Sequence, residues 1–245
     1  MTALLELSGV WAGYGGSDVL RDLSFTVPAG GVTCVVGPNG AGKSTILRVV
    51  SGQVRPRLGT VTFDGQQIGG RNPRQILGLG IVQVAQSHSL FPDMTVRENV
   101  EMGGFLIRDR AEVAKRRKQI EELFPIVTDR ADDKAGSLSG GQQRLVEFAR
   151  CLMLDPKLVV LDEPSMGLDP KTLRNVLTQI RAMWQDGRTI LLVEQNVRAG
   201  LSMATHAVVV ESGHVRLQGT GAEVVDNPEI AQLYLGGGST PAPVA

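Results

Sequence analysis

The feature that most constrains this chain is a glycine-rich loop between an apolar run and a helical pattern. The loop spans residues 37–45 and reads Gly-Pro-Asn-Gly-Ala-Gly-Lys-Ser-Thr. It follows the β-type run 32–36 and leads into the apolar segment 46–50. Strand, loop and helix therefore come in the order that a phosphate-binding loop requires.

Each residue type in this loop suits the binding of phosphate. Gly40 and Gly42 let the backbone turn its N–H groups toward one point, and the helix that begins near Lys43 presents its positive dipole end there. Lys43 would reach the outer phosphates, and the Ser44 hydroxyl would hold a magnesium ion. The alternative is a turn that merely joins a strand to a helix. The loop predicts that a nucleoside triphosphate contacts Gly37, Pro38, Asn39, Gly40, Ala41, Gly42, Lys43, Ser44 and Thr45.

Alternating apolar and polar residues on both sides of the loop predict a β-rich N-terminal layer. The segments 4–10, 20–27 and 60–63 have this alternation and are separated by turn residues, which indicates antiparallel strands. We group the strand before Gly37 with them.

The second half of the chain predicts helices and then a parallel sheet. From about 96 to 154 the pattern is helical, and a half-buried helix is predicted over 140–154. The β-type runs 158–161 and 189–193 flank a helical stripe, which is a parallel crossover unit, so we expect a mainly parallel sheet under the phosphate loop. Residues 207–210 and 215–217 predict a closing hairpin, and residues 236–245 a disordered tail.

Composition excludes some classes of partner. Lys+Arg and Asp+Glu are both 25, so there is no overall charge to attract nucleic acid or an anionic membrane. The basic cluster 115–118 lies beside glutamates and is typical of a solvated helix face, with nucleic-acid binding as the alternative. Cys34 and Cys151 lie in apolar segments and indicate core residues in a reducing compartment. We expect no signal peptide and no membrane span, because no apolar run approaches about 18 residues.

Two adjacent carboxylates follow the apolar run 158–161. In a parallel sheet the end of this strand lies at the same edge as the phosphate loop. Asp162 can then hold magnesium through water, while Glu163 points at the γ-phosphate and polarises an attacking water. A surface turn is the alternative.

The stretch 137–144 reads Ser-Leu-Ser-Gly-Gly-Gln-Gln-Arg and separates this chain from other nucleotide hydrolases. Here the sequence resembles the ATP-binding cassette (ABC) ATPases, whose signature is Leu-Ser-Gly-Gly-Gln. Ser139 and two glycines at a helix N-terminus form a second anion site; the alternative is a plain helix cap. The signature residues expected at the nucleotide are Ser139, Gly140, Gly141 and Gln142.

The resemblance covers about residues 4–235 and implies an ABC ATPase fold, α/β with a P-loop NTPase core, a mainly parallel sheet, an N-terminal antiparallel β layer and an inserted α-helical subdomain. It implies one domain, 1–235, with the core at about 1–85 and 155–235 and the helical subdomain at about 86–154. It also implies that two cassettes pack head to tail, each signature closing the other's phosphate loop. ATP and Mg²⁺ are the implied ligands.

Further residues are assigned by the same resemblance. Tyr14 matches the aromatic that stacks on adenine, although Trp11 is close enough to compete and a core aromatic is an alternative. Gln86 matches the glutamine that ligates magnesium and senses the membrane partner, with Ala85 in place of the usual proline. Residues 165–169 match the loop that crosses the dimer interface.

One position departs from most of the family. The strand 189–193 is usually followed by a histidine that contacts the γ-phosphate, and Gln195 occupies that position here. Gln195 can donate a hydrogen bond but cannot carry the charge of an imidazolium, so we expect weaker transition-state stabilisation at this chain's own loop.

Glu194, Gln195 and Asn196, with the ending 227–236, resemble the shorter ATPase subunit of branched-chain amino-acid importers. That resemblance implies a second ATPase subunit, two permeases, an extracytoplasmic binding protein and a place at the cytoplasmic face of the membrane. That subgroup usually has Glu-Gly-Arg around positions 86–88, where this chain has Gln86-Ser87-His88. Related urea and amide importers share most of the other features. Two other classes are a soluble cassette of translation or DNA repair and a nucleotide-driven clamp without useful hydrolysis.

Overall fold

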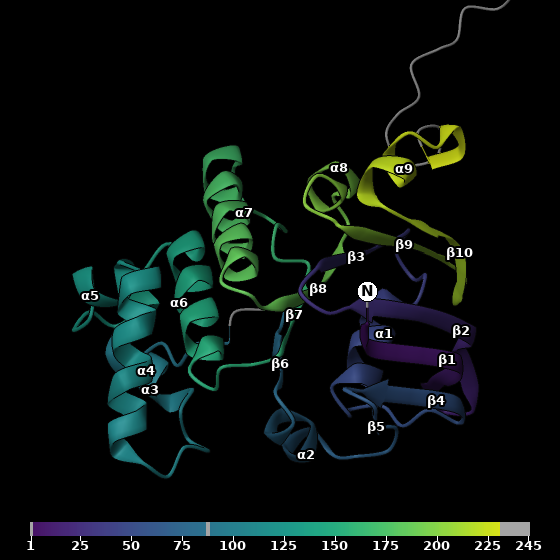
Figure 1. Ribbon diagram of the computed structural model, residues 1–245. Coiled ribbons are helices and arrows are strands. Elements are labelled where there is room, and N and C mark those ends of the chain that lie inside the picture. The colour runs from purple at the N-terminus through teal and green to yellow at the C-terminus, as the bar shows by residue number, and fades with distance from the viewer. Residues whose placement is uncertain (1, 87–88, 231–245) are drawn as a thin grey trace, which may run out of the picture.

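The computed structural model describes residues 2–86 and 89–230 (Figure 1). Four strands form an antiparallel sheet in the order β2–β1–β4–β5. These strands are β1 (Ala3–Tyr14), β2 (Ser17–Pro28), β4 (Leu58–Phe63) and β5 (Gln66–Gln67). The predicted N-terminal antiparallel layer is confirmed.

A second sheet of six strands has the order β10–β9–β3–β8–β7–β6. Its strands are β3 (Val32–Val36), β6 (Ile81–Val84), β7 (Leu158–Asp162), β8 (Thr189–Glu194), β9 (His206–Glu211) and β10 (His214–Gly219). All its pairs are parallel except the predicted β9–β10 hairpin. Our grouping of β3 with the N-terminal layer is wrong: both edges of β3 pair with the later strands β8 and β9, which places the phosphate loop over the parallel sheet.

The helices divide into two groups. Four α-helices lie together to the side of the sheets, at the left of Figure 1, where the sequence predicts helix. These are α3 (Val96–Met102), α4 (Arg110–Leu123), α5 (Ile126–Asp129) and α6 (Gly140–Leu152), and a 3₁₀ turn, η1 (Ala135–Ser137), precedes α6. The other helices are α1 (Lys43–Val50), α2 (Pro73–Gly78), α7 (Pro170–Gln185), α8 (Val197–Leu201) and α9 (Gly221–Val225).

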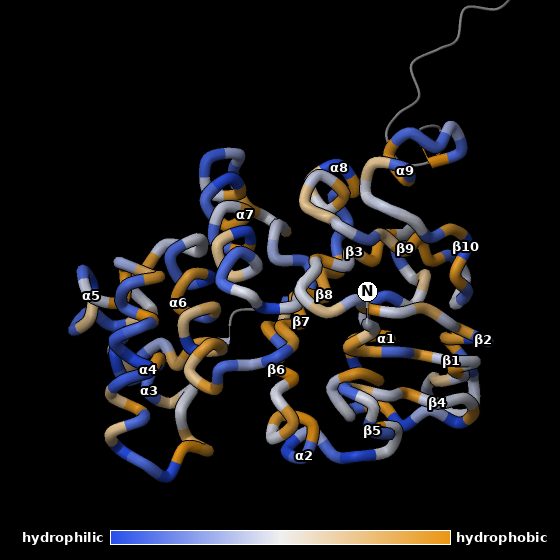
Figure 2. The backbone as a smooth tube through the Cα atoms, in the orientation of Figure 1, coloured by the Kyte–Doolittle hydropathy of each residue, from blue (hydrophilic) through white to orange (hydrophobic). Residues whose placement is uncertain are grey.

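The parallel sheet is buried on both faces, as its continuous apolar strands require. Val160 and Leu191 face α1 and the antiparallel sheet, whereas Val159 and Leu192 belong to the core shared with α6 and α7. Figure 2 shows apolar residues along β6 and β7, between these two layers. Burying one such side chain contributes about 1.5–3 kcal/mol, so the strand alternation fixes α1 and α6 on opposite faces of the sheet.

The expected disordered tail, 236–245, lies outside the described residues. Within the described ranges, no helix has the length and apolar character that a membrane crossing requires.

Candidate functional site

The loop between β3 and α1 curls around the ammonium of Lys43. Its Nζ donates to the carbonyl oxygens of Gly37 at 2.8 Å and Pro38 at 3.1 Å. Burial lowers the pKa of the ammonium, and the nearby carboxylates of Glu163 and Asp162 oppose that shift. A cationic side chain is thus held inside the loop, close to two acidic groups.

Two glycines are required by the geometry of this loop. Gly42 has φ of 106° where α1 begins, and a Cβ there would lie 2.7 Å from Leu20 Cδ2. A Cβ on Gly37 would lie 2.1 Å from the carbonyl oxygen of Val210. Because the first backbone N–H groups of α1 precede any carbonyl of their own helix, they can donate to an anion in the loop.

The turn between β9 and β10 supports the loop, and the sequence did not reveal this contact. The N–H of Gly213 donates to the carbonyl of Ala41 at 3.0 Å, and its own carbonyl accepts from the N–H of Arg21. Val19, on β2, lines the phosphate pocket with Lys43. These contacts join segments far apart in sequence, so no local pattern could indicate them.

Glu163 lies where three parts of the chain meet. It follows β7 with φ of 45°, and its N–H donates to the carbonyl of Val193 at 2.9 Å. Such a left-handed backbone costs a non-glycine residue about 1–2 kcal/mol. The turn places the carboxylate in a pocket of about 170 Å³ that Lys43, Ser44 and Thr45 also line.

Gln86 reaches Glu163 from the segment after β6. Its Nε2 lies 3.1 Å from Glu163 Oε2, to which it donates, and 3.0 Å from the sulfur of Met166. Met166 belongs to the predicted interface loop 165–169. The structure therefore brings together three regions that the sequence singled out separately.

Asp162 fits a magnesium site. Its Oδ1 is buried without a hydrogen-bond partner, and burial, then Glu163, raises the pKa of its carboxyl, against the opposing effect of Arg48. A hard cation takes such oxygen ligands, so the orphaned atom suits Mg²⁺. Asp162 and Gln86 line one pocket of about 520 Å³, and Ser44 lines the phosphate pocket. Glu163 joins the two, because it lines the phosphate pocket and contacts Gln86.

Gln195 follows β8 and shares a pocket of about 270 Å³ with Glu163. The preceding Glu194 is fully buried and accepts hydrogen bonds from the Ser165 N–H at 3.1 Å and Oγ at 2.6 Å. Glu194 thus fixes the chain just after Glu163, a role that the sequence analysis missed. A carboxylate ending an apolar strand was the available signal, as it was for Asp162.

Tyr14 ends β1 with 44% of its surface exposed. Its hydroxyl accepts a hydrogen bond from Arg48 Nη1 at 2.9 Å, and the guanidinium carbon lies 5.7 Å from the ring centroid. Trp11 is only half-buried on the same strand. The greater exposure favours Tyr14 as the adenine-stacking ring, which stays a prediction.

The signature residues begin α6 and contact one another rather than the phosphate pocket. Ser139 Oγ accepts from the Gln142 N–H at 3.4 Å, and Gln142 Oε1 accepts from the Ser139 N–H at 3.0 Å, which is a capping box. Ser139 and Gly140 are exposed. Gly141 allows close approach to α7, since a Cβ there would lie 2.1 Å from Thr172 Cγ2.

A glycine loop between a parallel strand and a helix, beside a strand that ends in two carboxylates, defines a P-loop nucleoside triphosphatase. The sequence profile of the ABC transporter family matches residues 20–166. The chain therefore belongs to the ABC transporter family, and its reaction is ATP hydrolysis coupled to transport.

Similar proteins support this family assignment over almost the whole chain. The high-affinity branched-chain amino acid transport ATP-binding protein BraG of Pseudomonas aeruginosa is 36% identical, over 96% of this chain and 100% of its own. BraF of the same organism is 32% identical over 95% and 98%. The ADP conformation of an ATP-binding cassette from an ABC transporter superposes with a TM-score of 0.87 at 29% identity, over 96% and 100%. A dimeric cassette bound to ADP and phosphate gives 0.76 at 25% identity, over 88% and 98%.

Proposed function

We propose that this chain is the ATPase subunit that energises an importer of branched-chain amino acids. The contact between Gln86 and Glu163 carries the proposal, because it joins the residue assigned to sensing the membrane partner with the residue assigned to hydrolysis. The substrate class is supported by the similarity to BraG and BraF. We also keep the division into a core, 1–85 with 155–235, and a helical subdomain, 86–154, as a proposal.

In this proposal the phosphate loop binds and orients ATP. Lys43 and the N–H groups that open α1 hold the outer phosphates, and Tyr14 stacks on adenine. Ser44, Asp162 and Gln86 would hold Mg²⁺, which when bound neutralises charge on the β- and γ-phosphate oxygens. The orphaned Oδ1 of Asp162 supports this assignment.

Glu163 is the proposed general base. A water oxygen forms a bond to the γ-phosphorus while the bond to the bridging oxygen breaks, leaving ADP and phosphate, and the water proton passes toward the Glu163 carboxylate. Gln86 Nε2 fixes Oε2 of that carboxylate, and Gln195 donates a hydrogen bond to the γ-phosphate. Glu163 as a residue is 8% exposed, so little of it faces bulk solvent.

The site is completed by a second ATPase subunit. Ser139–Gln142 are not among the described residues that line the phosphate pocket, and α1 and α6 pack on opposite faces of the parallel sheet. We infer a head-to-tail dimer in which the signature of the partner covers this loop. The exposed cap at Ser139 is then available to the partner's nucleotide.

Two permeases form the proposed membrane part, which would hold the chain at the cytoplasmic face of the membrane. An apolar groove of about 250 Å³ lies beside β6, with Met102 and Phe105 exposed at its edge. Gln83 lines this groove three residues before Gln86. A helix of a permease docked here would move the segment that contacts Glu163.

The proposed transport function is tested by purifying the chain together with the permeases and the binding protein that neighbouring genes encode. We expect co-purification and an ATPase rate that rises when the binding protein is loaded with leucine, isoleucine or valine, but not with urea or acetamide. Stimulation by urea or acetamide instead would identify the related importer class. A purified complex with neither association nor stimulation would overturn the transport proposal.

A nucleotide-driven clamp is the second candidate, and Gln195 is the observation that favours it. If the chain only closes on ATP, the wild type and Glu163→Gln will hydrolyse ATP at equal rates in the assembled complex. Our leading proposal expects the variant to be far slower.

A further inference from the structure

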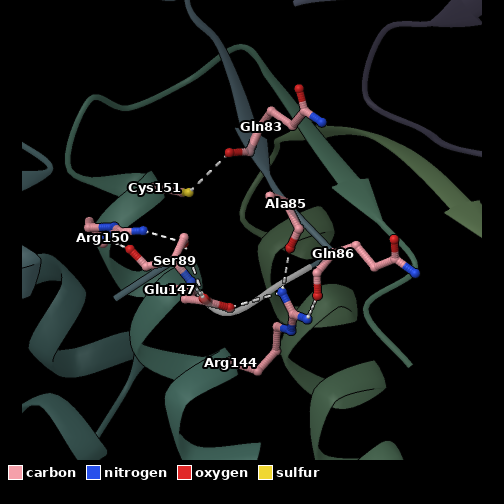
Figure 3. A network of polar contacts seen from close by, with 8 residues as sticks. All are labelled: Gln83, Ala85, Gln86, Ser89, Arg144, Glu147, Arg150 and Cys151. Atoms are coloured by element: carbon pink, nitrogen blue, oxygen red, sulfur yellow. Dashed lines mark hydrogen bonds and ion pairs between the residues drawn. The ribbon is translucent and has the colours of Figure 1, made fainter. Parts of the chain in front are cut away.

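The side chain of Arg144 on α6 holds the main chain of the segment that carries Gln86 (Figure 3). Its Nη1 donates to the carbonyl oxygen of Ala85 and its Nη2 to that of Gln86, both at 2.8 Å. Only 4% of Arg144 is exposed. A buried guanidinium therefore fixes two successive carbonyls from the signature helix.

Glu147, three residues along α6, completes this arrangement. It is fully buried and accepts from Arg144 Nη1 at 2.9 Å, so the cation is paired inside the protein. Its other oxygen accepts from the N–H of Ser89 at 2.5 Å and the Ser89 hydroxyl at 3.1 Å. Figure 3 shows these contacts running from one face of α6 to both Gln86 and Ser89.

We propose that Arg144 is a positioning residue that couples the signature helix to the hydrolytic carboxylate of its own chain. The contacts form one connected path from α6 through Arg144 to Gln86, and from Gln86 Nε2 to Glu163 Oε2. Ser139, the exposed residue that caps the N-terminus of the same helix, directly precedes its first residue, Gly140. A shift of α6 when Ser139 meets the partner's nucleotide changes where Gln86 lies at this chain's own site.

The planar fork of arginine explains why this residue type is needed. Its two terminal nitrogens reach two successive carbonyls at once, while one of them also binds Glu147. Pairing with Glu147 alone would need no contact with Ala85 or Gln86. A lysine could keep the charge beside Glu147 but would offer a single nitrogen.

This inference rests on the proposed roles of Gln86 and Glu163, so the experiment is a double-variant cycle in the assembled complex. Arg144→Lys, Gln86→Ala and their combination are compared with Arg97→Lys, which alters an exposed ion pair with Asp132. We expect Arg144→Lys to lower kcat about tenfold with KM for ATP within about twofold, since a small misplacement near the reacting groups is costly. When Gln86→Ala is already present, adding Arg144→Lys should lower kcat by less than about twofold more.

The positioning role would be overturned if Arg144→Lys left kcat unchanged. It would also be overturned if the fold-loss in kcat of the double variant equalled the product of the two single-variant losses. If Gln86→Ala or Glu163→Gln leaves kcat unchanged, the proposed function fails instead, and the two failures are distinct. Where Arg144→Lys does not fold, Arg144→Met/Glu147→Gln removes the buried charges together and keeps an acceptor for Ser89. This double substitution then takes the place of Arg144→Lys in the cycle, and the same two results would overturn the positioning role.

Discussion

The phosphate loop and the signature helix are both glycine-rich helix N-termini, but their surroundings differ. The loop is enclosed by its own chain: Lys43 binds two loop carbonyls, and Ala41 accepts from Gly213. The signature is exposed, and Ser139 and Gln142 cap each other. The chain alone builds a place for phosphate, and in the proposed dimer a second subunit closes it.

The largest effect on ATP hydrolysis should come from a substitution in the enclosed phosphate pocket. Glu163→Gln keeps the size of the side chain but removes the proton acceptor, so ATP hydrolysis in the complex should fall by about 10²–10⁴ while ATP binding is retained. Steady-state ATPase rates and nucleotide titration measure the two effects. Glu122→Gln, at an exposed site on α4, is the matched control. A loss below about fivefold would contradict the assignment of Glu163.

In the exposed signature, the substitution Ser139→Asp distinguishes the role of Ser139 as the cap of α6 from its proposed role in closing the partner's nucleotide site. Aspartate caps helices as well as serine does, so the thermal unfolding temperature of the isolated chain should stay within about 2 °C. Its negative charge would repel the partner's γ-phosphate, and ATPase activity of the complex should fall about 10²-fold. Nucleotide binding by the isolated chain should not change. Reduced binding there would place the signature at this chain's own nucleotide.

Gly42→Ala tests how tightly the loop is enclosed. The new Cβ would be strained at φ of 106° and would meet Leu20, so we expect a loss of about 2–3 kcal/mol in unfolding free energy. Gly16→Ala is the control, because φ is 92° there but nothing lies within 4 Å of the new atom. That variant should lose only about 1–2 kcal/mol. Equal losses in denaturant melts would mean that packing against Leu20 contributes nothing.

The smallest expected effect is a pH dependence of folding stability that comes from the buried Glu194. Burial raises its pKa, so the folded state binds the proton more tightly than the unfolded state does. Stability then falls as pH rises from the ordinary value of 4.5 through the raised value. The unfolding temperature of Glu194→Gln minus that of the wild type should therefore increase with pH across this window. A difference that stays constant across this window would contradict this.

The sequence predicted the parts of the site that are contiguous in the chain. The phosphate loop, the carboxylates after β7 and the cap of α6 each lie in one short stretch, where residue spacing fixes local geometry. The contacts between stretches could not be predicted in the same way. Gly213 meets Ala41, and both edges of β3 pair with strands beyond residue 188, only because the folded sheet places them together.

The measurement that tests the account most directly is photolabelling of the purified complex. The reagent is an ATP analogue that carries a photoreactive group on its γ-phosphate, and the complex contains a Lys43→Ala variant of this chain. The variant disables this chain's own phosphate loop, and peptide mass spectrometry locates the label. We predict that residues 139–142 of this chain are still labelled, because the nucleotide they meet is held by the partner subunit. Loss of that label in Lys43→Ala would show that the signature serves its own loop and would contradict closure by a second subunit.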